Sequence, residues 1–271
     1  MFDNIIGTIF RFLKFAPELP PTRWQSIDIS DKPFMSTREL LNYSFQYQVP
    51  KEGLQALRDD VKPNLPWADI HFETERVSGQ PINPGESWKL WPGAISAGTM
   101  IREQGQYDHS YAERYWPSFA GITPGGLIEE RSLGGIAPLR GVRFVYGDLF
   151  DLVELLQKDP QTRQAYLPVW FPEDLAAANQ DRRVPCTLGY HFIMRNQELH
   201  VVYYMRSCDV VKHFRDDVYL TARLLLWVLE ELRKIDAEWD HVYPGTLTMH
   251  ITSLHLFTAD YKRIFRYEKV D

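Results

Sequence analysis

The chain has 271 residues and a formal net charge of −6, with 44% hydrophobic and 24% charged residues. This composition is typical of a soluble globular protein, and the acidic balance argues against a nucleic-acid-binding surface, because phosphate contacts need a basic face. The two cysteines exclude a disulfide scaffold and a cysteine-rich zinc site, and they indicate a reducing compartment.

The N-terminal residues 1–14 are apolar but interrupted by Asp3 and Arg11. They lack the positively charged start of a signal peptide, and no segment of the chain offers the ~20 apolar residues that span a bilayer. We therefore expect a cytoplasmic protein without a membrane partner. Residues 1–14 are predicted to form an amphipathic helix that packs on the domain or on a partner.

The next segments alternate between proline-rich and periodic patterns. Residues 15–35 contain four prolines and predict a wrapped linker. Ser36 and Glu39 have the spacing of a capping box ahead of two leucines, which predicts a helix starting there. A second helix is expected from about residue 51 to residue 61.

The middle of the chain contains a Gly- and Pro-rich segment, residues 121–141, which predicts a surface loop that can serve as a lid. A helix is expected from Asp148 to Lys158, because its leucines and valine recur on one side. It should end at Asp159, since the residue before a proline disfavours the helical conformation.

The stretch from Arg183 to Asp217 organises the rest of the chain. Two aromatic and β-branched runs, separated by a short polar segment at 195–198, are typical of an antiparallel hairpin. Its two ends lie together in space, so Cys186 can approach Arg206. A guanidinium beside a thiol favours the nucleophilic thiolate. The alternative is a buried cysteine and a solvated arginine.

Two further elements complete the pattern. Residues 218–235 are apolar around most of a helix circumference, which predicts a central helix. Residues 245–257 predict a strand, and within it lies His255.

The hairpin and its flanks resemble the thymidylate synthase family. Pro185-Cys186 and the run from Met205 to Val211 match its motifs, and the stretch from Arg206 to Asp217 resembles the deoxycytidylate (dCMP) hydroxymethylase branch from bacteriophages. Cys186, Arg206, Asp209 and Asp217 fall into the family's register without a gap.

The resemblance implies an α/β fold in which helices flank a large mixed β-sheet, and a homodimer formed through that sheet. It covers about residues 64–260, so residues 1–60 are interpreted as an N-terminal extension or diverged helices. Residues 61–271 would then be the catalytic domain, in which the loop at about 121–141 is an insertion.

The resemblance also implies the roles of the site residues. Cys186 would add to carbon 6 of a pyrimidine nucleotide, and 5,10-methylenetetrahydrofolate would supply the one-carbon unit. The implied nucleotide contacts are Arg206, Ser207, Tyr111, His255 and, across the dimer interface, Arg163. The implied folate contacts are Asp209 and Trp91.

The resemblance places a catalytic glutamate in the region of residues 71–76. Glu73 is the first choice, with Glu75 and Asp69 behind it, because the register needs a small gap. The resemblance also implies a later strand at residues 110–116. Asp69, His71 and Glu73 could instead bind a metal, but such sets are common by chance, and we expect no metal site.

Asp217 selects the base under this interpretation, while Asp216 caps the following helix. A carboxyl group can accept from the exocyclic amine of cytosine and, with one shared proton, bind its N3. The implied activity is conversion of dCMP to 5-hydroxymethyl-dCMP.

Departures from the family pattern keep alternatives open. Gln164 replaces a second arginine, Ala112 a glycine and Phe257 a tyrosine at the sugar. The alternatives are a deoxyuridylate (dUMP) hydroxymethylase, a methyl-transferring synthase, and a non-catalytic nucleotide-binding protein on the same fold.

Overall fold

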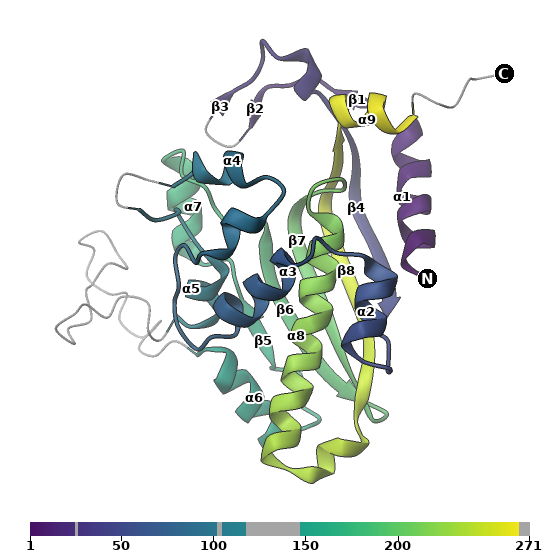
Figure 1. Cartoon of the computed structure of the whole chain (residues 1–271), viewed down its shortest axis with the longest axis vertical. Helices are drawn as coiled ribbons and strands as arrows, with labels where there is room; N and C mark the ends of the chain where they lie inside the picture. Colours follow the sequence, from purple (N-terminus) through teal and green to yellow (C-terminus); the bar gives the residue numbers. More distant parts are fainter. Residues whose placement is uncertain (25–26, 102–104, 118–146, 266–271) are drawn as a thin grey trace.

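The computed structural model describes residues 1–24, 27–101, 105–117 and 147–265 (Figure 1). Within these residues, six strands form one mixed sheet in the order β1-β4-β8-β7-β6-β5. Its strands are β1 (Glu18–Leu19), β4 (Thr37–Gln48), β5 (Tyr166–Pro168), β6 (Thr187–Arg195), β7 (Glu198–Asp209) and β8 (Tyr243–Phe257). The expected α/β fold with a mixed sheet flanked by helices is therefore confirmed.

The remaining elements surround this sheet. A small ribbon is formed by β2 (Arg23–Trp24) and β3 (Ile27–Asp28). The longer helices are α1 (Phe2–Phe15), α2 (Leu54–Val61), α6 (Leu149–Lys158), α7 (Pro172–Asn179), α8 (Phe214–Ile235) and α9 (Thr258–Phe265). The short ones are η1 (Pro33–Met35), α3 (Trp67–His71), η2 (Phe72–Arg76), η3 (Ser87–Leu90), α4 (Ala94–Gly98), α5 (Tyr111–Tyr115) and η5 (Ala237–His241).

Helix α8 forms the centre of the molecule and lies along one face of the sheet (Figure 1). It connects β7 to β8, which pair in parallel, as a crossover between parallel strands requires. Its buried residues include Val218, Leu225 and Leu229, which pack into the main core. The predicted central helix is confirmed, although it begins at Phe214, four residues earlier than expected.

Most of the helices and strands predicted from local patterns are present. Helix α1 buries Phe2, Ile6, Ile9 and Leu13 on one face and lies beside β4 (Figure 1). Helices α2 and α6 fall close to the expected ranges, and Asp148 caps α6 through its side chain. The strand expected at 245–257 is β8.

The hairpin of β6 and β7 is also confirmed. Its two turn residues, Asn196 and Gln197, both have positive φ angles of 51° and 61°. Turns of this kind match the right-handed twist of the flanking strands.

Two expected elements were wrong. The helix predicted to begin at Ser36 is the strand β4, which pairs with β8 from Thr37 to Gln48. The Ser36 hydroxyl bonds to Glu18 and Thr258 rather than capping a helix. The strand expected at 110–116 is the short helix α5, which has a true capping box formed by Ser110 and Glu113.

The predicted division near residue 60 remains a prediction. Strand β4 comes from before that boundary but pairs along its length with β8, which comes from after it. The loop expected at 121–141 lies outside the described residues. None of the helices within the described ranges combines the length and apolar run that crossing a bilayer requires.

Candidate active site

The start of β6 brings the predicted nucleophile and its cation together. Arg206 donates from Nε to the carbonyl of Pro185 (2.9 Å) and from Nη2 to that of Val184 (3.1 Å). These bonds hold Nη2 3.8 Å from the Cys186 sulfur, which is half-buried. The two ends of the hairpin therefore meet as the sequence predicted.

A β-bulge between Thr187 and Gly189 shapes the strand directly after Cys186. Bulges commonly aim side chains at functional sites. Gly189 is required there, because a Cβ atom would lie 2.3 Å from the Tyr166 hydroxyl and 2.7 Å from the Leu167 carbonyl.

The electrostatics of Cys186 differ from the sequence prediction. Burial raises the pKa of the thiol, and this outweighs the opposing effect of the Arg206 guanidinium. The negative charge of Asp217 raises the pKa further, while Arg183 lowers it. Arg206 thus acts in the expected direction, but the thiol stays protonated at neutral pH in the free protein.

Asp217 is half-buried on the first turn of α8, close enough to Cys186 to affect the pKa of its thiol. Burial raises the pKa of its carboxyl to about 7, against an opposing effect of Arg76. Among the described residues, Cys208 makes the only side-chain hydrogen bond to this carboxylate, with its sulfur 3.5 Å from Oδ2. Asp217 can therefore exist in both protonation states near neutral pH.

Asp216 does not cap α8 as the sequence suggested. His213 is at the N-cap, and Asp216 lies within the first turn. Its carboxylate accepts from the backbone N–H of Asn64 (2.9 Å) and from its side-chain amide (2.6 Å). Asp216 thus ties α8 to the segment before α3.

A chain of hydroxyls lies beside the thiol. The Tyr111 hydroxyl is 2.8 Å from the Thr187 hydroxyl, which is 2.7 Å from that of Tyr203. Burial raises the pKa of Tyr111, and the charges of Asp217 and Cys186 both act on it. Tyr111 therefore lies in the same region as both.

The predicted folate contacts gather at the end of β7. Asp209 is buried, and its Oδ1 accepts from the backbone N–H groups of Val211 (2.9 Å) and Lys212 (3.1 Å). Its strand position pairs with His255 on β8. Trp91 stacks on His213, with ring centroids 5.3 Å apart, and His213 lies within the electrostatic reach of Asp209.

The other predicted nucleotide contacts are distributed differently. Ser207 is opposite Ser253 in the β7–β8 pairing, and His255 is edge-on to Phe257 at 5.5 Å. Arg163 is exposed, and its carbonyl accepts from His191, five residues along β6 from Cys186. At ~3.3 Å per residue, this is on the order of 15 Å from the thiol. Arg163 therefore does not join the Cys186 cluster within one chain.

The three candidate carboxylates on α3 and η2 have different environments. Asp69 is paired with Arg58 and Arg223 and accepts from Tyr219. Glu73 is 57% exposed and forms an ion pair with Arg223 at 2.9 Å. Glu75 is 7% exposed and faces the interior. Buried carboxylates held by hydrogen bonds are the better candidates for proton transfer.

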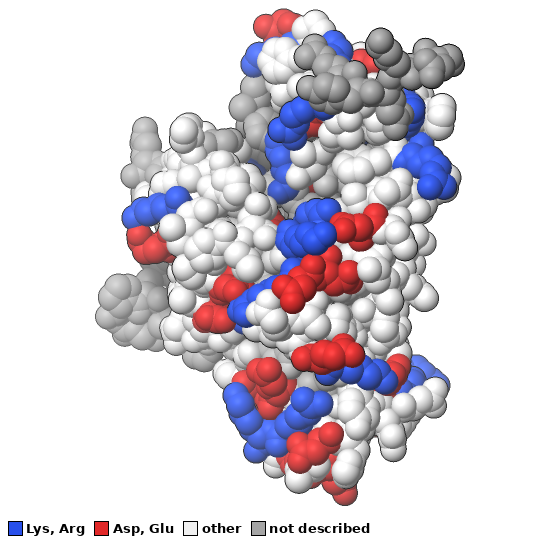
Figure 2. Space-filling view, turned by 45° about the vertical axis from the view of Figure 1, so that its right-hand side comes forward, with Lys and Arg blue, Asp and Glu red and all other residues white. Residues whose placement is uncertain are grey.

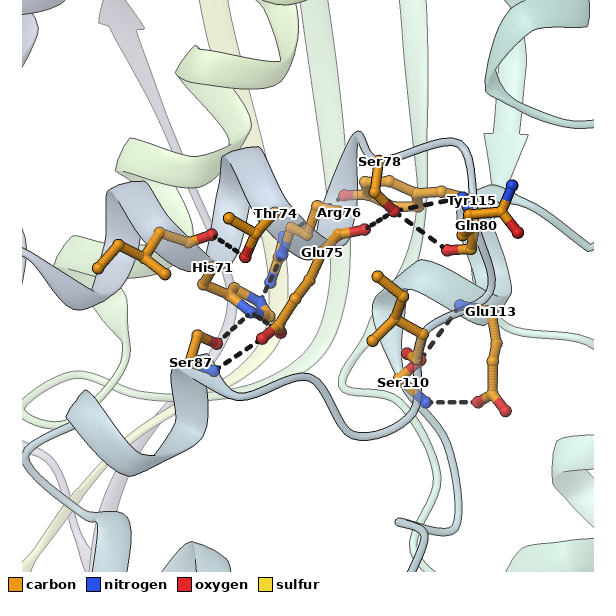
Figure 3. A network of polar contacts seen from close by, with 12 residues as sticks. His71, Thr74, Glu75, Arg76, Ser78, Gln80, Ser87, Ser110, Glu113 and Tyr115 are labelled. Carbon is orange, nitrogen blue, oxygen red and sulfur yellow. Dashed lines mark hydrogen bonds and ion pairs between the residues drawn. The ribbon is translucent and has the colours of Figure 1, made fainter.

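Glu75 belongs to a polar network that also contains His71, Arg76 and Ser87 (Figure 3). His71 Nδ1 is 2.7 Å from Glu75 Oε2, and the Ser87 backbone N–H donates to Oε1 at 2.8 Å. These bonds outweigh the effect of burial and hold the pKa of the Glu75 carboxyl below its usual value. Glu75 is therefore ionised at neutral pH.

Comparison with known proteins was decisive for the family. The model of the family described as Thymidylate synthase matches residues 88–266, more than half of the chain. The chain belongs to the thymidylate synthase family. The matched range contains the Cys186 hairpin, the Asp217 helix and His255, but it starts after the network around Glu75.

Two curated relatives are similar to this member of the thymidylate synthase family. Both bear the name "Putative thymidylate synthase" and come from Methanosarcina barkeri and Methanosarcina mazei. Each is 26% identical over 113 residues, which is 42% of this chain and 47% of the relative. The chain thus spans about half the length of the curated relatives it matches.

Several residues of the site had no place in the sequence interpretation. They are Arg76, Thr187, Tyr203, Cys208 and His213, and His71 had been considered only as a possible metal ligand. His71 and Glu75 are four residues apart on one helix, which places their side chains on one face and could have favoured Glu75 over Glu73. No local pattern indicates the contacts of Cys208 or Tyr203, because they join distant segments.

The hypothetical metal set of Asp69, His71 and Glu73 does not converge, since each side chain engages other partners. Within the described parts of the chain, no group of three or more His, Cys, Asp or Glu is arranged to hold a metal ion.

Proposed function

We propose that this protein is a folate-dependent pyrimidine-nucleotide one-carbon transferase, and specifically that it converts dCMP to 5-hydroxymethyl-dCMP. The observation that carries the proposal is the juxtaposition of a half-buried Cys186 thiol, the Arg206 guanidinium 3.8 Å away and the half-buried carboxyl of Asp217. These groups supply a nucleophile, a cation for a phosphate and a group that reads a base.

The reaction begins when the Cys186 sulfur adds to carbon 6 of the pyrimidine. This addition makes carbon 5 nucleophilic, so that one difficult step is split into two easier ones. Arg206 favours the thiolate and binds the nucleotide phosphate, to which Ser207 adds a hydroxyl donor. Because burial raises the pKa of the free thiol, ionisation of Cys186 depends on the arrangement of charges in the complex with nucleotide.

Asp217 faces the Watson–Crick edge of the base in this proposal. A carboxyl that carries a proton can donate to N3 of cytosine and accept from its exocyclic amine. A pKa of about 7 makes this protonated form accessible at physiological pH. A mismatch at such a pairing costs about 1–3 kcal/mol. The choice of cytosine rests on the resemblance of the stretch from Arg206 to Asp217 to the dCMP hydroxymethylase branch.

Glu75 replaces Glu73 as the proposed proton acceptor for carbon 5. Its carboxylate is buried and held on both oxygens, whereas Glu73 is committed to a surface ion pair. A general base of this kind contributes typically 10²- to 10⁴-fold to the rate.

The residues at the end of β7 fit a pterin donor. The buried Asp209 carboxylate suits the paired N–H donors of a pterin edge, and Trp91 stacked on His213 provides a flat aromatic surface beside it. When bound, 5,10-methylenetetrahydrofolate would supply the one-carbon unit. Asp209 would orient it, and Trp91 would exclude water from one side.

A homodimer formed through the open face of the sheet is part of the proposal. The residues of β7 and β8 on that face, such as Tyr204 and His250, are half-buried or exposed. Arg163 lies beside His191 of β6, too far from the thiol of its own chain to serve it, and we propose that it reaches the nucleotide phosphate in a partner subunit.

The second candidate is action on dUMP, with hydroxymethyl or methyl transfer. It is favoured by the same Asp217 carboxyl, since its protonated form can also donate to O4 of uracil and accept from N3–H. The two candidates differ in substrate and in product mass.

Mass spectrometry of products from dCMP and dUMP, each with methylenetetrahydrofolate, tests the proposal. We expect dCMP to gain a hydroxymethyl group and the Cys186→Ala variant to give no product. Turnover of dUMP alone would reject the choice of base. If neither nucleotide turns over, and a 5-fluoropyrimidine nucleotide forms no adduct with Cys186, the protein is not an enzyme of this class.

A further inference from the structure

Arg76 is a buried cation without a carboxylate partner in the described part of the chain. It is 5% exposed. Its Nε donates to His71 Nε2 at 2.9 Å, and Nη1 lies 3.4 Å from the Tyr115 hydroxyl. Burying a charged guanidinium is costly unless its N–H groups are hydrogen-bonded. The bond to His71 is one of those that replace the lost water.

The Arg76 contact fixes the proton on the His71 ring. A guanidinium has only donors, so His71 Nε2 must be the acceptor. In a neutral imidazole the proton then resides on Nδ1. Burial lowers the pKa of His71, which keeps the ring neutral. His71 Nδ1–H faces Glu75 Oε2 at 2.7 Å and donates to it.

Neighbouring groups hold this arrangement in place. The His71 ring stacks on Trp67, with centroids 5.1 Å apart and 9° between the planes. The Ser87 backbone N–H donates to the other oxygen of Glu75. The carboxylate thus has one fixed donor on each oxygen, while its remaining lone pairs can accept from water or substrate.

The π-helical turn η2 explains how His71 and Arg76 meet. Val77 N–H donates to the Phe72 carbonyl five residues earlier, at 3.1 Å. A π-turn brings residues five apart over one another, which an α-helical turn does not do. Such turns frequently occur at functional sites.

Arg76 also connects this network to the thiol. Its guanidinium lies 4.0 Å from the centre of the Tyr111 ring, and the Tyr111 hydroxyl bonds to Thr187, the residue after Cys186. The same cation acts on the Asp217 carboxyl. One arginine therefore contacts both the Glu75 side and the Cys186 side of the site.

We propose that Arg76 and His71 are positioning residues, in which Arg76 fixes His71 as the Nδ1–H tautomer and His71 serves as a permanent donor that aims the Glu75 carboxylate. His71 is then a fixed donor and carries no proton in the reaction. This inference rests on the proposed role of Glu75, and the geometry of the network stands independently of it.

Two substitutions of His71 separate the two ring nitrogens. In His71→Asn the side-chain amide can reach the Nδ1 position and still donate to Glu75. In His71→Gln the amide reaches the Nε2 position, so it can accept from Arg76 but offers Glu75 no donor. We expect kcat to fall less than about tenfold in His71→Asn and about 100-fold in His71→Gln, with KM unchanged. His241→Asn, at an exposed histidine, is the matched control.

Two results would overturn the inference. If His71→Gln is as active as His71→Asn or more so, the donor to Glu75 does not matter. If both folded variants lose activity equally, His71 carries a proton itself.

The tautomer can be read without turnover, by two-bond ¹H–¹⁵N correlation on wild-type protein labelled at histidine. The His71 signals are assigned by their absence in either variant, and an Nε2–H tautomer would also refute the inference. If the wild-type protein turns over neither dCMP nor dUMP, the proposed function fails. The measured His71 tautomer would still show whether Arg76 fixes the ring as proposed.

Discussion

The sulfur of Cys208 lies 3.5 Å from Asp217 Oδ2 and donates to it. The second cysteine is thus placed against the group that is proposed to read the base. Burial raises the pKa of the Cys208 thiol, and the negative charge of Asp217 raises it further. Cys208 stays a thiol and acts as a weak donor to the carboxylate.

Substitution of Cys208 should move the titration of Asp217. Cys208→Ala removes the donor to the ionised form, so the pKa of Asp217 should rise from its value of about 7. Cys208→Ser introduces a stronger donor, and the pKa should fall. Carbon-13 NMR of the Asp217 carboxyl measures both. Equal values in the two variants would mean that the sulfur makes no bond in solution.

Asp217 should also make stability depend on pH. Its pKa is raised from 3.8 to about 7 by burial, so the folded state holds a proton that the unfolded state releases between these values. Stability therefore falls as pH rises from about 4 to 7, by on the order of 4 kcal/mol from this group. Asp217→Asn should remove this loss, so the free energy of unfolding of the variant should increase relative to that of the wild type as pH rises. Urea unfolding at pH 5 and pH 8 measures the difference, and a constant difference would contradict it.

The same substitution should change the substrate. An asparagine amide whose N–H points at O4 of uracil accepts from N3–H, and an amide held in that orientation mismatches cytosine. We expect Asp217→Asn to lose about 5- to 150-fold in kcat/KM for dCMP and to gain activity with dUMP. Competition between the two nucleotides gives the ratio. An unchanged preference would remove Asp217 from the base pocket.

The pH dependence of Cys186 alkylation by iodoacetamide should show how neighbouring charges affect the pKa of its thiol. Because the pKa of this thiol is raised above 9.0, the rate should increase up to alkaline pH. Asp217→Asn should lower the midpoint by removing a negative charge, and Arg206→Gln should raise it. Arg11→Gln, at an exposed arginine on α1, is the control. Midpoints that stay unchanged, or that move in the opposite directions, would contradict the proposed effect of these two charges on the sulfur.

Glu75 and Glu73 form a matched pair of substitutions. Glu75→Gln should lower the release of tritium from carbon 5 of the nucleotide by 10²-fold or more, because it removes the proton acceptor. Glu73→Gln should retain activity and lose only a surface ion pair, worth about 0–1 kcal/mol. The reverse order of activities would restore Glu73 to the catalytic role.

The sequence was most informative where partners are close along the chain. The β6–β7 hairpin and the meeting of Cys186 with Arg206 follow from strand alternation and one turn. On one face of the molecule, Lys and Arg side chains are interspersed with Asp and Glu (Figure 2).

The sequence failed where distant segments decide the outcome. Ser36 and Glu39 have capping-box spacing, but residues 37–48 form a strand because β8, about 200 residues later, offers them a full set of partners. Tertiary pairing overrides such local preference. The choice of Glu73 followed family register and stays a prediction, whereas our proposal of Glu75 rests on burial, which depends on how α3 and η2 pack.

The position of β8 has a consequence for synthesis of the protein. This strand lies between β4 and the β6–β7 hairpin in the sheet but follows both in the sequence, so it is synthesised after them. Until residues 243–257 leave the ribosome, the two halves of the sheet have nothing between them, and His255 cannot lie beside Asp209. Contacts of such large sequence separation slow folding. A nascent chain that lacks β8 should therefore bind no nucleotide, however complete its cysteine hairpin is.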